Sequence, residues 1–187
     1  MKIRLASNLQ TDSIVDGEGL RTVIWTQGCS HNCFGCHNKE TQDFNGGFTV
    51  DVEDVKKQLK ELKFQDGITL SGGDPLFQAP ACLEIAKYAK KLGLNIWCYT
   101  GFTYEKLMEM CKTNDKLLEL LKNIDVLIDG KFDINLKSFN APYRGSTNQR
   151  VIDVKQSLKK GKVCTIKKYD YKKDELLEYK KSTEVYI

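Results

Sequence analysis

Short apolar runs alternate with segments of helical periodicity along most of this chain. Four runs are rich in β-branched and aromatic side chains and are predicted as strands, at residues 21–26, 67–71, 95–99 and 124–129. Apolar side chains recur at the spacing of a one-sided buried helix in two further segments, residues 52–62 and 79–92. Strands that alternate with helices of this length predict an α/β fold with a parallel sheet and crossover helices.

Residues at the ends of these segments support the predicted division into strands and helices. Gly93 directly follows the second helical segment, where a glycine commonly ends a helix, and Thr103 precedes the next segment, where a hydroxyl can cap a helix. Polar and glycine-rich stretches follow the predicted strands, after Thr26, Leu70, Tyr99 and Ile128. Because functional groups gather at the carboxyl ends of parallel strands, we expect these stretches to form one rim that carries the site.

The overall composition is that of an ordinary globular protein. With 187 residues, of which 41% are hydrophobic and 29% charged, one domain is expected. No apolar run approaches the ~18 residues that a membrane-spanning helix needs, and no apolar stretch follows the basic N-terminus as in a signal peptide. The chain is therefore predicted to be cytoplasmic, without a membrane partner, and its seven cysteines to be reduced.

Positive charge gathers near the C-terminus. Residues 155–187 hold ten lysines against five acidic residues, whereas the whole chain has a net charge of +4. A basic segment can bind nucleic acid or an acidic protein. Because its acids are interleaved and it contains no arginine, a solvated surface is favoured and no nucleic-acid partner is expected. Within it, residues 163–166 are a candidate strand, and residues 172–181 a candidate charged helix or a partly disordered segment.

Three of the cysteines fall within eight residues, at Cys29, Cys33 and Cys36, in the spacing C-x3-C-x2-C. Three thiolates on one loop can hold three irons of a cubane cluster, whose full ligation takes four cysteines. One iron is then open to another ligand. The remaining four cysteines are scattered, and Cys98, which lies in an apolar run, is expected to be a small buried side chain.

Three other interpretations of the cysteines compete with the cluster. A zinc ion could be bound by the three thiolates together with His31 or His37, although zinc sites usually draw cysteines from two separate loops. Cys33 to His37 matches the haem-attachment pattern C-x-x-C-H, which requires export and leaves Cys29 unexplained. A thioredoxin-like C-x-x-C pair also leaves one cysteine over. The spacing favours the cluster.

The cysteine loop resembles that of the radical S-adenosylmethionine enzymes. More narrowly, the chain resembles the activating proteins of anaerobic (class III) ribonucleotide reductases in six stretches, at residues 16–21, 27–38, 71–76, 100–101, 129–132 and 144–150. The resemblance implies a partial (β/α) barrel with a mostly parallel sheet, in a single radical S-adenosylmethionine domain over residues 1–187. Its core would span about residues 12–152. A basic extension, residues 153–187, follows, and no function is predicted for it.

The resemblance also implies which residues form the site. Cys29, Cys33 and Cys36 would hold a [4Fe–4S] cluster whose open iron chelates S-adenosylmethionine, and no catalytic side chain is implied beyond the cluster. Contacts to the cofactor are expected from Gly35, Cys36, His37, Gly72, Gly73, Asp74, Asp129 and Lys131. The turn at residues 72–74, with aspartate where the family usually has glutamate, would hold the methionine end. Asp129 would meet the ribose or the ammonium group, and Lys131 the carboxylate.

The activity implied by this resemblance is that of a glycyl-radical-enzyme activase. A reduced flavodoxin-like donor would supply the electron that cleaves S-adenosylmethionine, and the resulting 5′-deoxyadenosyl radical would generate a glycyl radical on the large subunit of the anaerobic ribonucleotide reductase. Alternatives are an activase of pyruvate formate-lyase, a small-molecule radical enzyme, an iron–sulfur electron carrier and a zinc module. Arg144 and Arg150 bracket a polar loop suited to a carboxylate, to partner docking or to solvent, and the sequence leaves this choice open.

Overall fold

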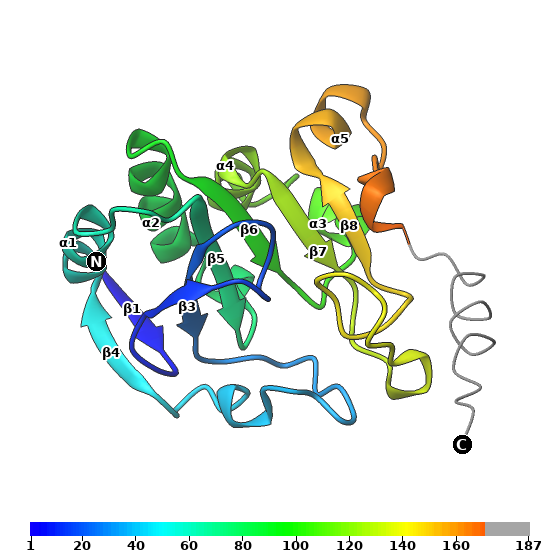
Figure 1. Cartoon of the computed structure of the whole chain (residues 1–187), viewed down its shortest axis with the longest axis horizontal. Helices are drawn as coiled ribbons and strands as arrows, with labels where there is room; N and C mark the ends of the chain where they lie inside the picture. Colours follow the sequence, from blue (N-terminus) through cyan, green and yellow to red (C-terminus); the bar gives the residue numbers. More distant parts are fainter. Residues whose placement is uncertain (171–187) are drawn as a thin grey trace, which may run out of the picture.

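An eight-stranded sheet forms the centre of the computed structural model, which describes residues 1–170 (Figure 1). The strands follow the order β4–β1–β3–β5–β6–β7–β8, and β2 pairs with β3 beside this path. Their bounds are β1 (Lys2–Leu5), β2 (Gln10–Ser13), β3 (Arg21–Thr26), β4 (Phe48–Asp51), β5 (Gly67–Gly72), β6 (Asn95–Tyr99), β7 (Val126–Asp129) and β8 (Arg150–Asp153).

Four neighbouring strands, β3, β5, β6 and β7, are parallel. They correspond to the four apolar runs, so the predicted parallel core is confirmed. The prediction of a mostly parallel sheet is wrong, because β1, β2, β4 and β8 all pair antiparallel. Each of these strands has only four residues, and antiparallel pairs need no crossover helix between them. The sheet is therefore mixed.

Helices cover one face of the sheet. Those described within residues 1–170 are α1 (Val52–Lys60), α2 (Ala79–Lys91), α3 (Tyr104–Met110), α4 (Asp115–Asn123) and α5 (Val154–Lys160). Both predicted helix ends are confirmed. Gly93 follows α2 with a φ of +79°, which glycine adopts easily, and the Thr103 hydroxyl accepts the Lys106 N–H at the start of α3.

The two faces of the sheet bury different groups of side chains, as β6 illustrates. Ile96 and Cys98 point into the main core together with side chains of α1, α2 and α4. Cys98 is 0% exposed, so its predicted burial is confirmed. Trp97, between them, points to the other face because side chains alternate along a strand. There it packs in a smaller cluster with side chains of β7 and β8.

The parallel strands end at a common edge, which lies at the bottom of Figure 1. The long connection from β3 to β4 runs along this edge and contains the three closely spaced cysteines. The predicted strand at residues 163–166 is reduced to an isolated bridge between Thr165 and Ile152. The predicted helix at residues 172–181 lies outside the described residues. Within residues 1–170, no helix combines the length and the hydropathy of a membrane span.

Candidate functional site

The cysteine loop is fixed at its base by hydrogen bonds. The backbone N–H groups of Gly28 and Cys29 donate to the carbonyls of residues 41 and 42 at 2.8 and 2.9 Å. The amide of buried Gln27 donates to two further carbonyls of the returning chain. These bonds connect the beginning of the loop to its end. They therefore fix the position of Cys29 relative to the end of β3.

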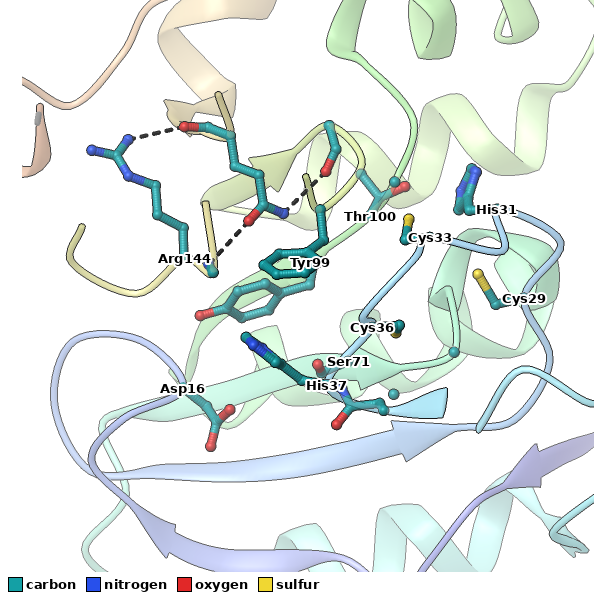
Figure 2. A pocket seen from close by; sticks show the side chains of 18 of the residues that line it. Asp16, Cys29, His31, Cys33, Cys36, His37, Ser71, Tyr99, Thr100 and Arg144 are labelled. Carbon is teal, nitrogen blue, oxygen red and sulfur yellow. Dashed lines mark hydrogen bonds between the residues drawn. The ribbon is translucent and has the colours of Figure 1, made fainter. Parts of the chain in front are cut away.

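Cys29, Cys33 and Cys36 line one pocket of about 580 Å³ (Figure 2). All three are free and of intermediate exposure. Partial burial raises the pKa of the Cys29 and Cys33 thiols above the ordinary value of 9.0. These two side chains are therefore neutral near pH 7, and a metal that binds them must displace their protons.

Residues that follow the other parallel strands line the same pocket. They are Gly72 and Gly73 at the end of β5, Thr100 and Gly101 after β6, and Gly130 after β7. The predicted convergence of these stretches on one rim is confirmed. It brings glycine-rich backbone into the same pocket as the cysteine loop.

The turn after β5 requires glycine at two consecutive positions. Gly72 has a φ of +102°, and a Cβ there would overlap the Thr26 backbone. A Cβ on Gly73 would overlap the Gly28 backbone directly before the cysteine loop. The Gly73 N–H donates to Thr26 O at 2.7 Å, and the Asp74 N–H donates to Gly28 O at 3.0 Å. The turn and the cysteine loop therefore pack backbone against backbone.

Asp74 is 1% exposed and lies behind the pocket wall. Its carboxylate accepts hydrogen bonds from His31 Nε2 at 2.7 Å, from the Thr100 hydroxyl at 2.8 Å, and from the Gly101 and Leu76 N–H groups at 3.0 Å each. The predicted contact of Asp74 with the methionine end of the cofactor stays untested. In this structure the carboxylate joins the cysteine loop to the ends of β5 and β6.

Asp129 is likewise 1% exposed and turned away from the pocket. Its carboxylate accepts two hydrogen bonds from the Arg150 guanidinium and one from the Tyr104 N–H. Lys131 is exposed, and its ammonium group lies 3.4 Å from the His31 carbonyl oxygen. The structure does not bring Asp129 and Lys131 together as one binding pair.

The two arginines that bracket the polar loop also have internal partners. Arg150 binds Glu105 with two hydrogen bonds of 3.0 and 2.8 Å in addition to its bonds to Asp129. Arg144 donates to the carbonyls of Gln149 at 3.1 Å and of Tyr169 at 2.5 Å. Both guanidinium groups thus hold the loop at residues 144–150 in place, and Arg144 also lines the pocket. Whether either arginine also binds a carboxylate or a partner stays a prediction.

Gly35 and His37 flank the third cysteine differently. Gly35 has a φ of +72°, and a Cβ there would lie 3.0 Å from the Ile134 side chain. The His37 ring lines the pocket and packs on Phe132 with centroids 4.8 Å apart. Of these two predicted cofactor contacts, only His37 presents a side chain to the pocket.

Several pocket residues have no predicted role. Asp16 and Tyr99 (Figure 2) line the pocket together with Gln149, and the Tyr99 hydroxyl donates to the Tyr143 carbonyl at 2.7 Å. Gln149 donates to Gly130 O at 3.0 Å and accepts the Gly145 N–H at 3.0 Å. Asp16 and Gln149 fall within stretches that carry the family resemblance. That resemblance is the sequence signal from which a place at the site could have been predicted for them.

The Arg150–Glu105 pair predicts a small dependence of stability on pH. The hydrogen bonds from Arg150 lower the pKa of Glu105 from 4.5 to about 2. The pair therefore contributes its full stability above pH 4.5, and that contribution is lost as the pH falls toward 2. Because Glu105 is largely exposed, the contribution is below about 1 kcal/mol. We expect Glu105→Gln to lower the urea midpoint at pH 6 but much less at pH 3. Equal effects at both pH values would contradict the assignment.

The three thiols suit an iron–sulfur cluster in number and placement. They come from one loop, none forms a disulfide, and they border a pocket wide enough for a further ligand. No other cysteine lines the pocket within the described chain. No three His, Cys, Asp or Glu side chains of residues 1–170 converge as ligands of a single metal ion. The fold and the site therefore define a candidate iron–sulfur protein.

Comparison with known proteins identifies the family. Residues 15–152 match the family described as a 4Fe-4S single cluster domain. The anaerobic ribonucleoside-triphosphate reductase-activating proteins of Salmonella typhi and of Escherichia coli K12 are both 38% identical over 146 residues, which cover 74% of this chain and 91% of each relative. The protein of that name from phage T4 is 36% identical over 147 residues, 73% of this chain and 86% of its own. The chain belongs to the family of anaerobic ribonucleoside-triphosphate reductase-activating proteins.

Among solved structures, QueE from Escherichia coli aligns at 17% identity with a TM-score of 0.48, over 55% of this chain and 54% of that chain.

Proposed function

We propose that the chain is a radical S-adenosylmethionine activase for an anaerobic ribonucleotide reductase. The observation that carries the proposal is the placement of all three cysteines of one C-x3-C-x2-C loop in a pocket shared with the glycine turn after β5. A [4Fe–4S] cluster and S-adenosylmethionine, when bound, supply a one-electron reductive cleavage to methionine and a 5′-deoxyadenosyl radical, which takes a hydrogen atom from a glycine of the partner. The electron would come from a reduced flavodoxin-like donor.

The residues of the pocket have distinct proposed tasks. Cys29, Cys33 and Cys36 hold three irons as thiolates. Gly72 and Gly73 present backbone without side chains, which lets the amino-acid end of the cofactor approach closely. Their carbonyls are suitable acceptors for its ammonium group.

The adenosyl end is proposed to lie along the third cysteine. The backbone at residues 35–36 and the His37 ring border that part of the pocket. Lys131 is proposed to meet the cofactor carboxylate. Asp74 and Asp129 act indirectly, because their carboxylates are buried and already accept hydrogen bonds from the chain itself.

The choice of partner rests on the names of the relatives together with the form of the pocket. The sheet has an open strand order from β4 to β8, as in a partial (β/α) barrel. Side chains at the pocket include exposed ones such as Val15, 71% exposed, and Phe139, 92% exposed. An open pocket with apolar side chains at its mouth suits a segment of a protein substrate, which brings its own bulk to exclude water.

The proposal is tested by reconstitution without oxygen. The chain is loaded with iron and sulfide, reduced, and given S-adenosylmethionine, and we expect 5′-deoxyadenosine. Addition of an anaerobic ribonucleotide reductase is expected to yield a glycyl doublet in the electron paramagnetic resonance spectrum. One equivalent of zinc with no iron-dependent absorbance, or no 5′-deoxyadenosine, would overturn the proposed chemistry. A doublet on pyruvate formate-lyase but not on the reductase would instead overturn the proposed partner.

A further inference from the structure

The chain continues past the matched region into a segment that returns to the sheet. The family match ends at residue 152, and α5 then leads into residues 164–169. The Asp153 N–H donates to Cys164 O, and the Ile166 N–H donates to Val151 O, both at 2.9 Å. The returning segment therefore covers the outer edge of β8, at the end of the strand order.

Tyr169 ends this segment and is buried, with 7% of its surface exposed. Its ring packs edge-on against Trp97 at 5.9 Å and against Tyr143 at 5.3 Å between centroids, and Trp97 and Tyr143 are themselves 5.1 Å apart. We call these three rings the Trp97 cluster. Gly17 also lies on it, because a Cβ there would come within 2.8 Å of the Trp97 ring. Segments far apart in the sequence thus meet at one tryptophan.

Two polar contacts extend the same connection. The Arg144 guanidinium donates to the Tyr169 carbonyl at 2.5 Å. The Lys168 ammonium group binds both carboxylate oxygens of Glu18 at 2.6 and 2.7 Å. Because the Lys168–Glu18 pair is exposed, it adds little energy by itself. The buried Tyr169 ring is therefore the main anchor.

The parts of the chain held in this way are two walls of the pocket. Val15 and Asp16 line it from the β2–β3 loop, which also contains Gly17 and Glu18. Tyr143 and Arg144 line it from the loop that leads to β8. A segment that only shielded the β8 edge would need neither the ion pair with the first loop nor the ring contact with the second.

We propose that residues 164–169 are a strap that holds both pocket walls in position, with Tyr169 as its positioning residue. The strap fixes the width of the pocket from outside, without contributing a ligand of its own. Its consequence for cofactor binding rests on the proposed function, whereas its effect on the two walls does not.

The mechanical part is tested on the full chain without cluster, by amide hydrogen exchange. Tyr169→Ala removes two edge-on aromatic contacts, so exchange in residues 14–19 and 139–149 is expected to rise about tenfold. Exchange in β5, which reports whole-molecule unfolding, is expected to change much less. Tyr169→Phe keeps the ring and both of its edge-on contacts, so it should retain most of the protection. Unchanged exchange in both walls of Tyr169→Ala would refute the strap.

The functional part uses the reconstituted chain. Tyr169→Ala is expected to bind as much iron as wild type and to raise the KM for S-adenosylmethionine about tenfold, with a smaller change in kcat. Lys167→Ala, an exposed neighbour, is the matched control and should leave KM unchanged. Loosened walls with an unaltered KM would overturn the link to cofactor binding. If wild type forms no 5′-deoxyadenosine, the proposed function fails, while the exchange result still decides the strap.

Discussion

Replacing Cys33 by alanine is expected to abolish cluster binding and the formation of 5′-deoxyadenosine. Cys33 lines the pocket between the other two cysteines of the loop, and its removal leaves two thiols for three irons. Even residues that only support metal ligands contribute 10- to 100-fold, so loss of a ligand should lower activity by at least about 100-fold. Iron should fall from about four per chain to near zero. Iron and sulfide assays and the iron-dependent absorbance measure the outcome.

Cys82→Ala is the matched control. Cys82 lies in α2, is 0% exposed, and donates to the Pro75 carbonyl. Burial raises the pKa of its thiol to about 12, so it stays protonated and is a poor ligand. The variant should lose about 1–2 kcal/mol of stability through the cavity it creates and still bind iron as wild type does. Equal loss of iron from the two variants would refute the assignment of the ligands.

The parallel core could be predicted because its strands carry their own signal. Each of β3, β5, β6 and β7 is nearly or fully buried along its length, and such strands appear as continuous apolar runs. β2, Gln10–Ser13, has three exposed positions out of four and no apolar pattern. A strand without an apolar pattern is stabilised by its pairing with a neighbouring strand, which for β2 is β3. The antiparallel edges therefore depend on tertiary contacts that a local pattern does not contain.

The cysteines could be assigned to one site because their chemistry and spacing are local. The aspartates could not, because their orientation is set by partners distant in sequence. Asp129 is the last residue of β7, where an exposed site residue could lie, yet Arg150 binds its carboxylate from a strand 21 residues later. Asp74 sits in a glycine turn, yet its side chain caps the 3-10 turn Pro75–Gln78 and accepts hydrogen bonds from residues 31 and 100. His31 adds a side-chain link between this turn and the cysteine loop to the backbone contacts at Gly28.

Asp74→Ala is expected to destabilise the chain and to weaken its hold on the cluster. The substitution leaves the His31 ring N–H, the Thr100 hydroxyl and two backbone N–H groups without their acceptor in a site that is 1% exposed. Removing one member of a buried ionic or hydrogen-bonded group of this size costs about 3–5 kcal/mol. Urea unfolding of the chain without cluster measures this loss.

The effect on the cluster follows from the position of His31, between the first two cysteines and held by the Asp74 carboxylate. Without that bond the loop loses its side-chain tie to the ends of β5 and β6 and keeps the backbone bond from Asp74 N–H to Gly28 O, so iron should be released to a chelator about 10- to 100-fold faster. Asp153→Ala is the control, because Asp153 also caps a helix, α5, through the Gln156 N–H, but lies outside the pocket lining. It should cost about 1 kcal/mol and leave the rate of iron release unchanged. If both variants released iron at the wild-type rate, Asp74 would be a cap for its own turn and no support for the cysteine loop.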